Sequence, residues 1–98
     1  MKTKLLTMHA IIEAVASITG KPAKVIRGAS RVASVVAARN LCYKIAKEQL
    51  YLSDKEIAQS FNRDRSSVTY SIRKVEKDIE ERPNYRITYK LIHQKLGI

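Results

Sequence analysis

The chain has 98 residues and one cysteine, which allows one modest hydrophobic core and excludes an internal disulfide. Lysine and arginine number 19 against 9 acidic residues, a formal charge of +10. Such an excess on so short a chain indicates a polyanionic partner, most often nucleic acid and less often an anionic membrane surface. No apolar run approaches the roughly 20 residues of a membrane span and no secretory signal is evident, so we expect a cytoplasmic protein.

The first two predicted helices are short and well delimited. Residues 5–18 place apolar side chains on one stripe, Thr7 can cap the start, and Gly20 ends the helix. A second helix is expected over residues 22–26, because a proline suits the first helical position, and Gly28 closes it.

A long third helix is predicted from Ser30 to about Leu50. Cys42 falls within its pattern, so we expect a small buried thiol rather than a nucleophile. The inward candidates are Val32, Val35, Val36, Cys42, Ile45 and Ala46, and the polar positions include Arg31, Arg39, Asn40, Lys44 and Lys47. Residues 14–47 contain seven cations and no acid, which favours a surface that meets nucleic acid.

Residues 53–79 carry the strongest pattern, a helix, a tight turn and a second helix. Ser53 and Glu56 form a capping box at the first helix, residues 62–64 break it, and Asp64 is a suitable N-cap for the second. Apolar residues at Val68, Ile72, Val75 and Ile79 leave Arg65, Ser66, Ser67, Thr69, Tyr70, Arg73, Lys74 and Lys77 on the remaining surface. Hydroxyls and cations at such a start suit a recognition helix in a DNA major groove, and the alternative is a surface helix pair in a small α-domain.

A break at Pro83-Asn84 precedes a last helix predicted over residues 85–96. Nothing repeats, and no stretch alternates convincingly as a strand. We therefore expect an all-α fold of about six helices with a helix-turn-helix, organised as one domain over residues 1–98 with an extra C-terminal helix.

Two stretches, RNLCYKIAKE at residues 39–48 and EIAQSFNRDRSSV at residues 56–68, carry a family resemblance. They resemble the C-terminal DNA-binding domain of the bacterial replication initiator DnaA, a helix-turn-helix fold similar to that of the Trp repressor. The family has an Arg-Gln pair opening a run such as RQxAMxLAKEL, followed by the signature EIGxxFGGRDHTTV. RKVE at residues 73–76 is similar to the family's RKIE. The resemblance covers about residues 10–80 and implies binding of double-stranded DNA.

The resemblance also implies roles for the matching positions. Arg31 falls where the family places an arginine in the minor groove beside the site. The base-reading positions are Asp64, Arg65 and Ser66, to which we add Thr69 from its place on the same helix. The phosphate-binding positions are Arg39, Asn40 and Ser67, to which we add the cations Lys44 and Arg73. For Tyr70, contact with phosphate and packing on the apolar face both remain open.

The chain departs from the family signature at the reading positions. Arg65 replaces a histidine, Ser66 and Ser67 replace threonines, and Asn62 stands where two glycines usually lie, which shortens the turn by one residue. Loss of a threonine methyl removes a contact with a thymine methyl, whereas arginine adds a bidentate donor for guanine. The family's own binding sequence is therefore not carried over to this chain.

The chain has no glycine-rich phosphate loop, since its three glycines are scattered. We expect no nucleotide, cofactor, metal or enzymatic activity, because His9 and His93 lie far apart and no paired carboxylates or nucleophile motif occur. If 98 residues is the whole protein, it is a stand-alone relative of the DnaA domain, nucleoid-associated and active in replication origin recognition or transcription regulation.

Two alternatives to sequence-specific binding remain open. One is a protein-interaction module on the same fold, and the other is a nonspecific DNA-architectural binder. The last helix lies largely outside the resemblance, and its Tyr85, Tyr89, Leu91 and Ile92 could form a homodimer or partner surface or pack on the core.

Overall fold

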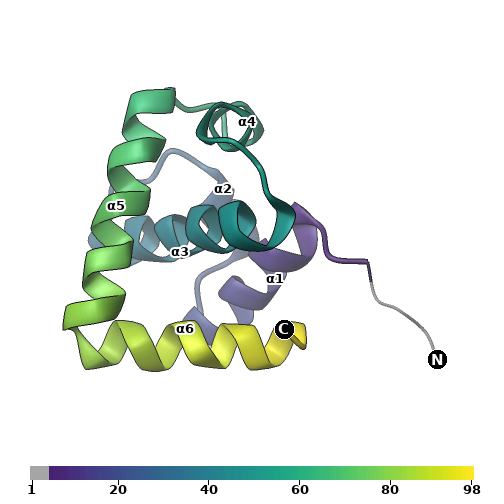
Figure 1. Cartoon of the computed structure of the whole chain (residues 1–98), viewed down its shortest axis with the longest axis vertical. Helices are drawn as coiled ribbons and strands as arrows, with labels where there is room; N and C mark the ends of the chain where they lie inside the picture. Colours follow the sequence, from purple (N-terminus) through teal and green to yellow (C-terminus); the bar gives the residue numbers. More distant parts are fainter. Residues whose placement is uncertain (1–4) are drawn as a thin grey trace.

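The computed structural model describes residues 5–98, which form six α-helices and contain no strand (Figure 1). The predicted all-α fold of about six helices is confirmed. No helix in this range is long and apolar enough to cross a membrane. The helices are α1 (Met8–Thr19), α2 (Ala23–Arg27), α3 (Ala33–Leu50), α4 (Asp54–Ser60), α5 (Arg65–Glu81) and α6 (Pro83–Leu96), and α4 and α5 form the helix-turn-helix.

Most helix ends follow the capping signals of the sequence. Thr7 accepts a hydrogen bond from the Ala10 amide at the start of α1, and Gly20 ends that helix with a φ of 75°. Ser53 and Glu56 form the predicted capping box of α4. The local sequence is therefore enough to fix these ends.

Three helices begin at residues other than those predicted. Pro22 caps α2 instead of forming its first turn. The loop before α3 extends to Val32, because the Ser30 hydroxyl accepts a hydrogen bond from the Val32 amide and holds a turn there. The last helix starts at Pro83 itself, where a missing N–H costs no helical hydrogen bond.

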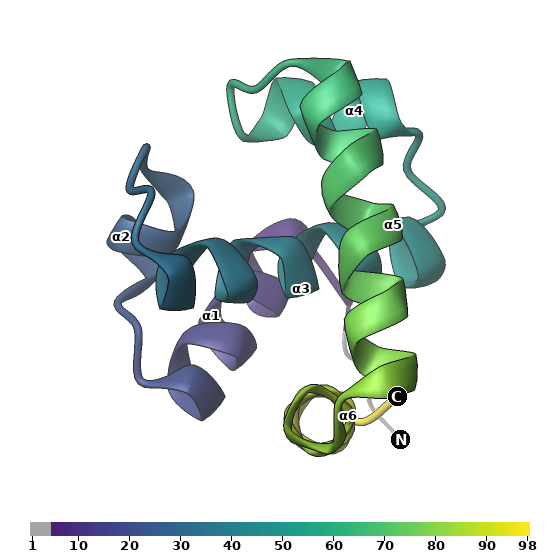
Figure 2. The ribbon, with the colours of Figure 1, turned by 90° about the vertical axis from the view of Figure 1, so that its left-hand side faces the viewer.

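One hydrophobic core joins all six helices, and α3 crosses its centre (Figures 1 and 2). Tyr43 of α3 and Phe61 after α4 make an edge-to-face contact with ring centroids 4.9 Å apart, which fixes the helix-turn-helix turn against α3. Cys42 is fully buried, and burial raises its pKa to about 12, so the expected buried thiol is confirmed. Other fully buried side chains are Ile11, Ile12, Val15, Ile26, Ile45, Ile57, Val68, Val75 and Ile92.

The faces of α3 differ from the predicted ones. The prediction that Arg39 and Asn40 lie on its polar surface is wrong, because their side chains are 4% and 7% exposed. Val32, predicted to point inward, is 61% exposed in the loop before the helix. Helices surround α3 on several sides, so burial at its positions does not follow a single apolar stripe.

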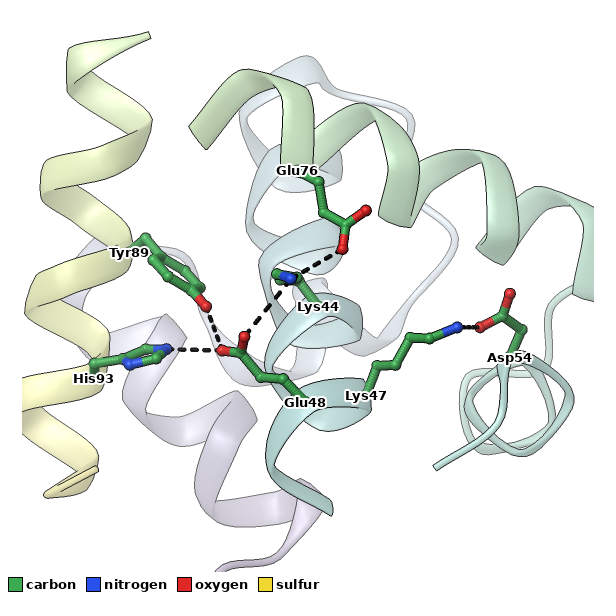
Figure 3. A network of polar contacts seen from close by, with 7 residues as sticks. All are labelled: Lys44, Lys47, Glu48, Asp54, Glu76, Tyr89 and His93. Atoms are coloured by element: carbon green, nitrogen blue, oxygen red, sulfur yellow. Dashed lines mark hydrogen bonds and ion pairs between the residues drawn. The ribbon is translucent and has the colours of Figure 1, made fainter. Parts of the chain in front are cut away.

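A carboxylate of α3 holds α6 in place (Figure 3). Glu48 accepts a hydrogen bond from the Tyr89 hydroxyl, and its Oε1 lies 2.9 Å from Nε2 of His93. Burial, and then the bond to Glu48, raise the pKa of Tyr89 and keep its hydroxyl a donor. Lys44 Nζ lies 3.6 Å from Glu48 Oε2 and 2.9 Å from Glu76 Oε2 on α5. These polar groups tie α3, α5 and α6 together.

Asp54, the first residue of α4, joins α4 to two other helices. Its Oδ1 lies 2.5 Å from Lys47 Nζ on α3, and its Oδ2 accepts a hydrogen bond from the Thr69 hydroxyl on α5. The hydrogen bonds from Lys47 and Thr69 lower the pKa of Asp54. A negative charge at a helix start is itself favourable.

Asp54→Asn should therefore lower the free energy of unfolding at neutral pH by about 1 kcal/mol. Because the folded-state pKa is depressed, the contribution is fully present above the unfolded value of about 3.9 and is lost as the pH falls through the folded pKa. Urea titrations at neutral and acid pH should show a difference from the wild type that shrinks in acid. Glu13→Gln, at an exposed acid of α1 with no ion pair among residues 5–98, is the control and should change little. An Asp54→Asn difference that is equal at both pH values would contradict this assignment.

Candidate nucleic-acid interface

The turn between α4 and α5 is built around one residue in a left-handed conformation. Asn62 has a φ of 53°, which asparagine tolerates better than most residues. The amide of Arg63 then donates to the Ala58 carbonyl at 2.8 Å and closes the end of α4. One asparagine thus makes the chain reversal in a turn that is shorter than the family signature.

The first turn of α5 presents polar side chains to solvent. Asp64 Oδ2 accepts a hydrogen bond from the Ser67 amide at 3.2 Å, so the predicted N-cap is confirmed. Arg65, Ser66 and Ser67 are exposed just after it. Tyr70 is 69% exposed, which shows that it projects outward rather than packing on the core.

The other polar side chains of α5 point in different directions. Thr69 points to α4, where its hydroxyl is bonded to Asp54. Ser67 and Ser71 face the loop before α3, and Arg73 is exposed farther along the helix. Figure 2 shows that α2 and the loop after it lie on the same side of the molecule as the turn between α4 and α5.

A pocket of about 160 Å³ lies between α5 and that loop. Its lining combines cationic and small polar side chains and contains no acid. Nη2 of Arg39 is buried and has no hydrogen-bond partner among the described residues. An unpaired buried polar nitrogen is costly, and its positive charge is not offset by any acid in the pocket that Arg39 lines. This anion pocket is lined by Ser30, Arg31, Val36, Arg39, Asn40, Tyr43, Arg63, Ser67 and Ser71.

The other guanidinium nitrogens of Arg39 are already bonded. Nε donates to the Ile26 carbonyl at 2.8 Å, and Nη1 donates to the Ser30 carbonyl at 3.1 Å. Burial, and then the neighbouring charge of Arg63, lower the pKa of Arg39. Like charges held this close repel each other, which favours the binding of an anion between them.

Arg63 is a functional candidate that the sequence analysis treated only as part of a turn. Its Nη2 donates to the Gly28 carbonyl at 2.8 Å, across 35 residues of sequence. No local sequence pattern predicts such a contact. Ser71 was also missed, although it follows Ser67 by one helical turn and could have been found from the helical period.

Two predicted contact residues lie elsewhere than expected. The ammonium group of Lys44 is paired with Glu76 and Glu48, and its side chain is only 22% exposed. The hydroxyl of Thr69 is committed to Asp54. These positions argue against the phosphate contact predicted for Lys44 and the base contact predicted for Thr69. Arg31, by contrast, is exposed beside the anion pocket.

A second hollow is not part of this surface. It measures about 680 Å³ and lies between α1 and α6, with apolar walls that include Leu6, Ala10 and Leu96. It has no convergent cluster of cations, so we assign it no part in anion binding. Within residues 5–98, no group of three or more His, Cys, Asp or Glu side chains is placed to hold a metal ion.

Comparison with known protein families agrees with this geometry. The family described as the bacterial DnaA protein helix-turn-helix matches residues 8–75. No curated protein matches the chain at a significant level. The matched range contains α1 to α4, the turn, the lining of the anion pocket and more than half of α5, whereas α6 lies outside it. A match over most of the 98 residues, with the helix-turn-helix in place, shows that the chain belongs to the family of bacterial DnaA helix-turn-helix domains.

Proposed function

We propose that the chain binds double-stranded DNA and reads its sequence with the first turn of α5. The observation that carries this proposal is the position of Arg65 and Ser66, exposed at the tip of the helix-turn-helix beside a cationic pocket without acids. A helix fits the major groove, where every base pair presents a distinct pattern of donors and acceptors.

Each residue proposed to read bases has hydrogen-bonding groups that match those of a base edge. The Arg65 guanidinium can donate two hydrogen bonds to guanine, and the Ser66 hydroxyl can donate or accept. Asp64 uses Oδ2 for its cap, which leaves Oδ1 to accept from a cytosine amino group. Arg31 would enter the adjacent minor groove from the loop before α3.

Phosphate contacts would set the register of the protein on the duplex. The anion pocket offers the Asn40 amide and the Ser67 hydroxyl to one phosphate, beside the buried charge of Arg39, and Arg73 would meet the backbone farther along α5. The overall charge of +10 adds sequence-independent attraction through counterion release. DNA binding of this kind uses no nucleotide, and it suits replication origin recognition or transcription regulation at the nucleoid.

The experiment that tests this function is a selection from random duplex DNA at about 150 mM salt, where nonspecific contacts are weakened. We expect one enriched motif. Retention of all sequences without enrichment would replace the proposal by a nonspecific architectural role. Absence of retention would refute DNA binding as the function.

Arg65→Ala should weaken binding to the selected duplex by about 1–3 kcal/mol and reduce discrimination at the base pair that it reads. Lys90→Ala removes the same charge on α6, at the end of the molecule opposite α4 and the first turn of α5, and is the matched control (Figure 1). Binding titrations with the selected duplex and single-base-pair variants measure both quantities. Unchanged affinity and preference in Arg65→Ala would remove Arg65 from the reading set.

Ser67→Ala should behave differently, because a phosphate contact carries no sequence information. We expect affinity for the selected and for a scrambled duplex to fall by a similar factor, about ten- to hundredfold for one hydrogen bond to a charged group. The salt dependence should not change, since no charge is removed. A loss confined to the selected duplex would instead place Ser67 at a base edge.

A second candidate function rests on the exposed face of α6. Ile87 and Leu91 lie one helical turn apart and are 57% and 43% exposed, and Arg86 and Lys90 flank them. Figures 1 and 2 place α6 at the end of the molecule opposite α4. The flanking cations repel a second copy of this face, so we propose a protein partner with acidic residues around an apolar centre rather than a homodimer.

The double substitution Ile87→Ser with Leu91→Ser should weaken binding of a synthetic acidic amphipathic helix by about tenfold or more, because it removes two apolar contacts. Calorimetric titration measures this binding, and sedimentation equilibrium should show a monomer. The selected duplex should bind the variant as it binds the wild type. Peptide binding that is equal in both proteins, or a wild-type dimer abolished by the substitutions, would contradict the proposed partner.

A further inference from the structure

We propose that Arg63 is a positioning residue that couples the helix-turn-helix turn to the loop that carries Arg31, and so fixes the minor-groove arginine relative to the recognition helix. This inference rests on the proposed function and deepens it. It assigns a specificity role to a side chain that need not touch a base.

Two arginines from different parts of the fold hold the segment between α2 and α3. Arg39 of α3 donates to the carbonyls of Ile26 and Ser30, and Arg63 of the turn donates to the carbonyl of Gly28. The three carbonyls alternate along the segment from the end of α2 to the residue before Arg31. We call these three hydrogen-bonded carbonyls and two guanidinium groups the loop clamp.

The clamp lies directly between the two proposed DNA-contacting segments. Arg31 follows Ser30, whose carbonyl is held, and Asp64, the cap of α5, follows Arg63. Within the segment itself, the Val32 amide donates to the Ser30 hydroxyl at 3.2 Å and the Gly28 amide to the Val25 carbonyl at 3.1 Å. These bonds shape the loop, but neither connects it to α5. The hydrogen bond from Arg63 to the Gly28 carbonyl connects the loop to the turn at the start of α5.

The chemistry requires an arginine. A guanidinium has five N–H donors in a rigid plane, so Arg63 can hold Gly28 with Nη2 and still present other N–H groups to the anion pocket, which it lines. A lysine in its place would keep the charge but present one flexible ammonium group. A phosphate in the pocket would therefore bind a guanidinium that already fixes the loop, so that phosphate contact and the position of Arg31 reinforce each other.

The competing reading is that Arg63 is one more phosphate contact. In that case Arg63→Lys would retain most binding, affect all duplexes equally and act additively with Arg31→Ala. Both readings preserve the salt dependence, because lysine keeps the charge. The loop clamp predicts two different results: reduced discrimination at the base pairs that Arg31 reads, and non-additivity with Arg31→Ala.

The experiment compares the wild type, Arg63→Lys, Arg31→Ala and the double variant on the selected duplex and on duplexes altered in the flanking minor-groove base pairs. Arg63→Lys should lose most of the discrimination that Arg31→Ala loses, and the double variant should lose little more. Arg86→Lys is a matched control, because Arg86 Nη2 also donates to a backbone carbonyl, that of Glu80, at 2.8 Å on the far side of the molecule. It should leave discrimination unchanged.

A second readout needs no DNA. Trypsin cuts after Arg31, and release of the loop should accelerate this cut several-fold in folded Arg63→Lys but not in Arg86→Lys, with circular dichroism showing that both remain folded. Faster cutting together with lost discrimination supports the proposal. Unchanged cutting, or faster cutting with full discrimination, overturns it. If the wild type itself shows no sequence preference, the proposed function fails, and the cutting rate alone then decides whether the clamp holds the loop.

Discussion

The interface depends on one buried guanidinium. Arg39 lies almost entirely inside the protein, and the cost of removing its charge from water is offset by hydrogen bonds to the carbonyls of Ile26 and Ser30. Those bonds give the loop before α3 its path, and the loop carries Arg31 to the surface. Without this arginine, two carbonyls would lose their charged partner and the loop its attachment to α3.

The same guanidinium explains why the pocket favours an anion. Its third nitrogen has no partner in the described residues, and Arg63 and Arg31 line the same space without any acid. The folded protein therefore holds positive charges together, at a cost that an oxyanion would reverse. The proposed phosphate affinity would come from electrostatic repulsion in the free protein as well as from hydrogen bonds in the complex.

Some of the other cations are paired with acids and are therefore not free to bind DNA. Glu76 and Asp54 pair with Lys44 and Lys47 and join α3 to α5 and α4, and Glu48 joins α3 to α6 through Tyr89 and His93 (Figure 3). Arg31, Arg65 and Arg73 have no such ion pair among the described residues and remain exposed. These three arginines lie on α5 or in the loop before α3, so their charge is available to DNA there.

Local sequence was enough to predict the starts of α1, α4 and α5, because the capping residues Thr7, Ser53 and Asp64 act within one turn of the chain. The apolar period of α5 likewise determined which of its faces is buried and which meets solvent. These are local rules, so they led correctly to an all-α helix-turn-helix protein and to its family.

Which polar side chains are available to a ligand follows from the packing of the helices and could not be predicted from the sequence. Arg39 is buried, Lys44 and Thr69 are bonded to acids of other helices, and Arg63 reaches a carbonyl 35 residues away. A side chain's availability for DNA depends on which distant atoms fill its hydrogen-bonding capacity. That pairing is set by helix packing rather than by the neighbours of each residue in sequence.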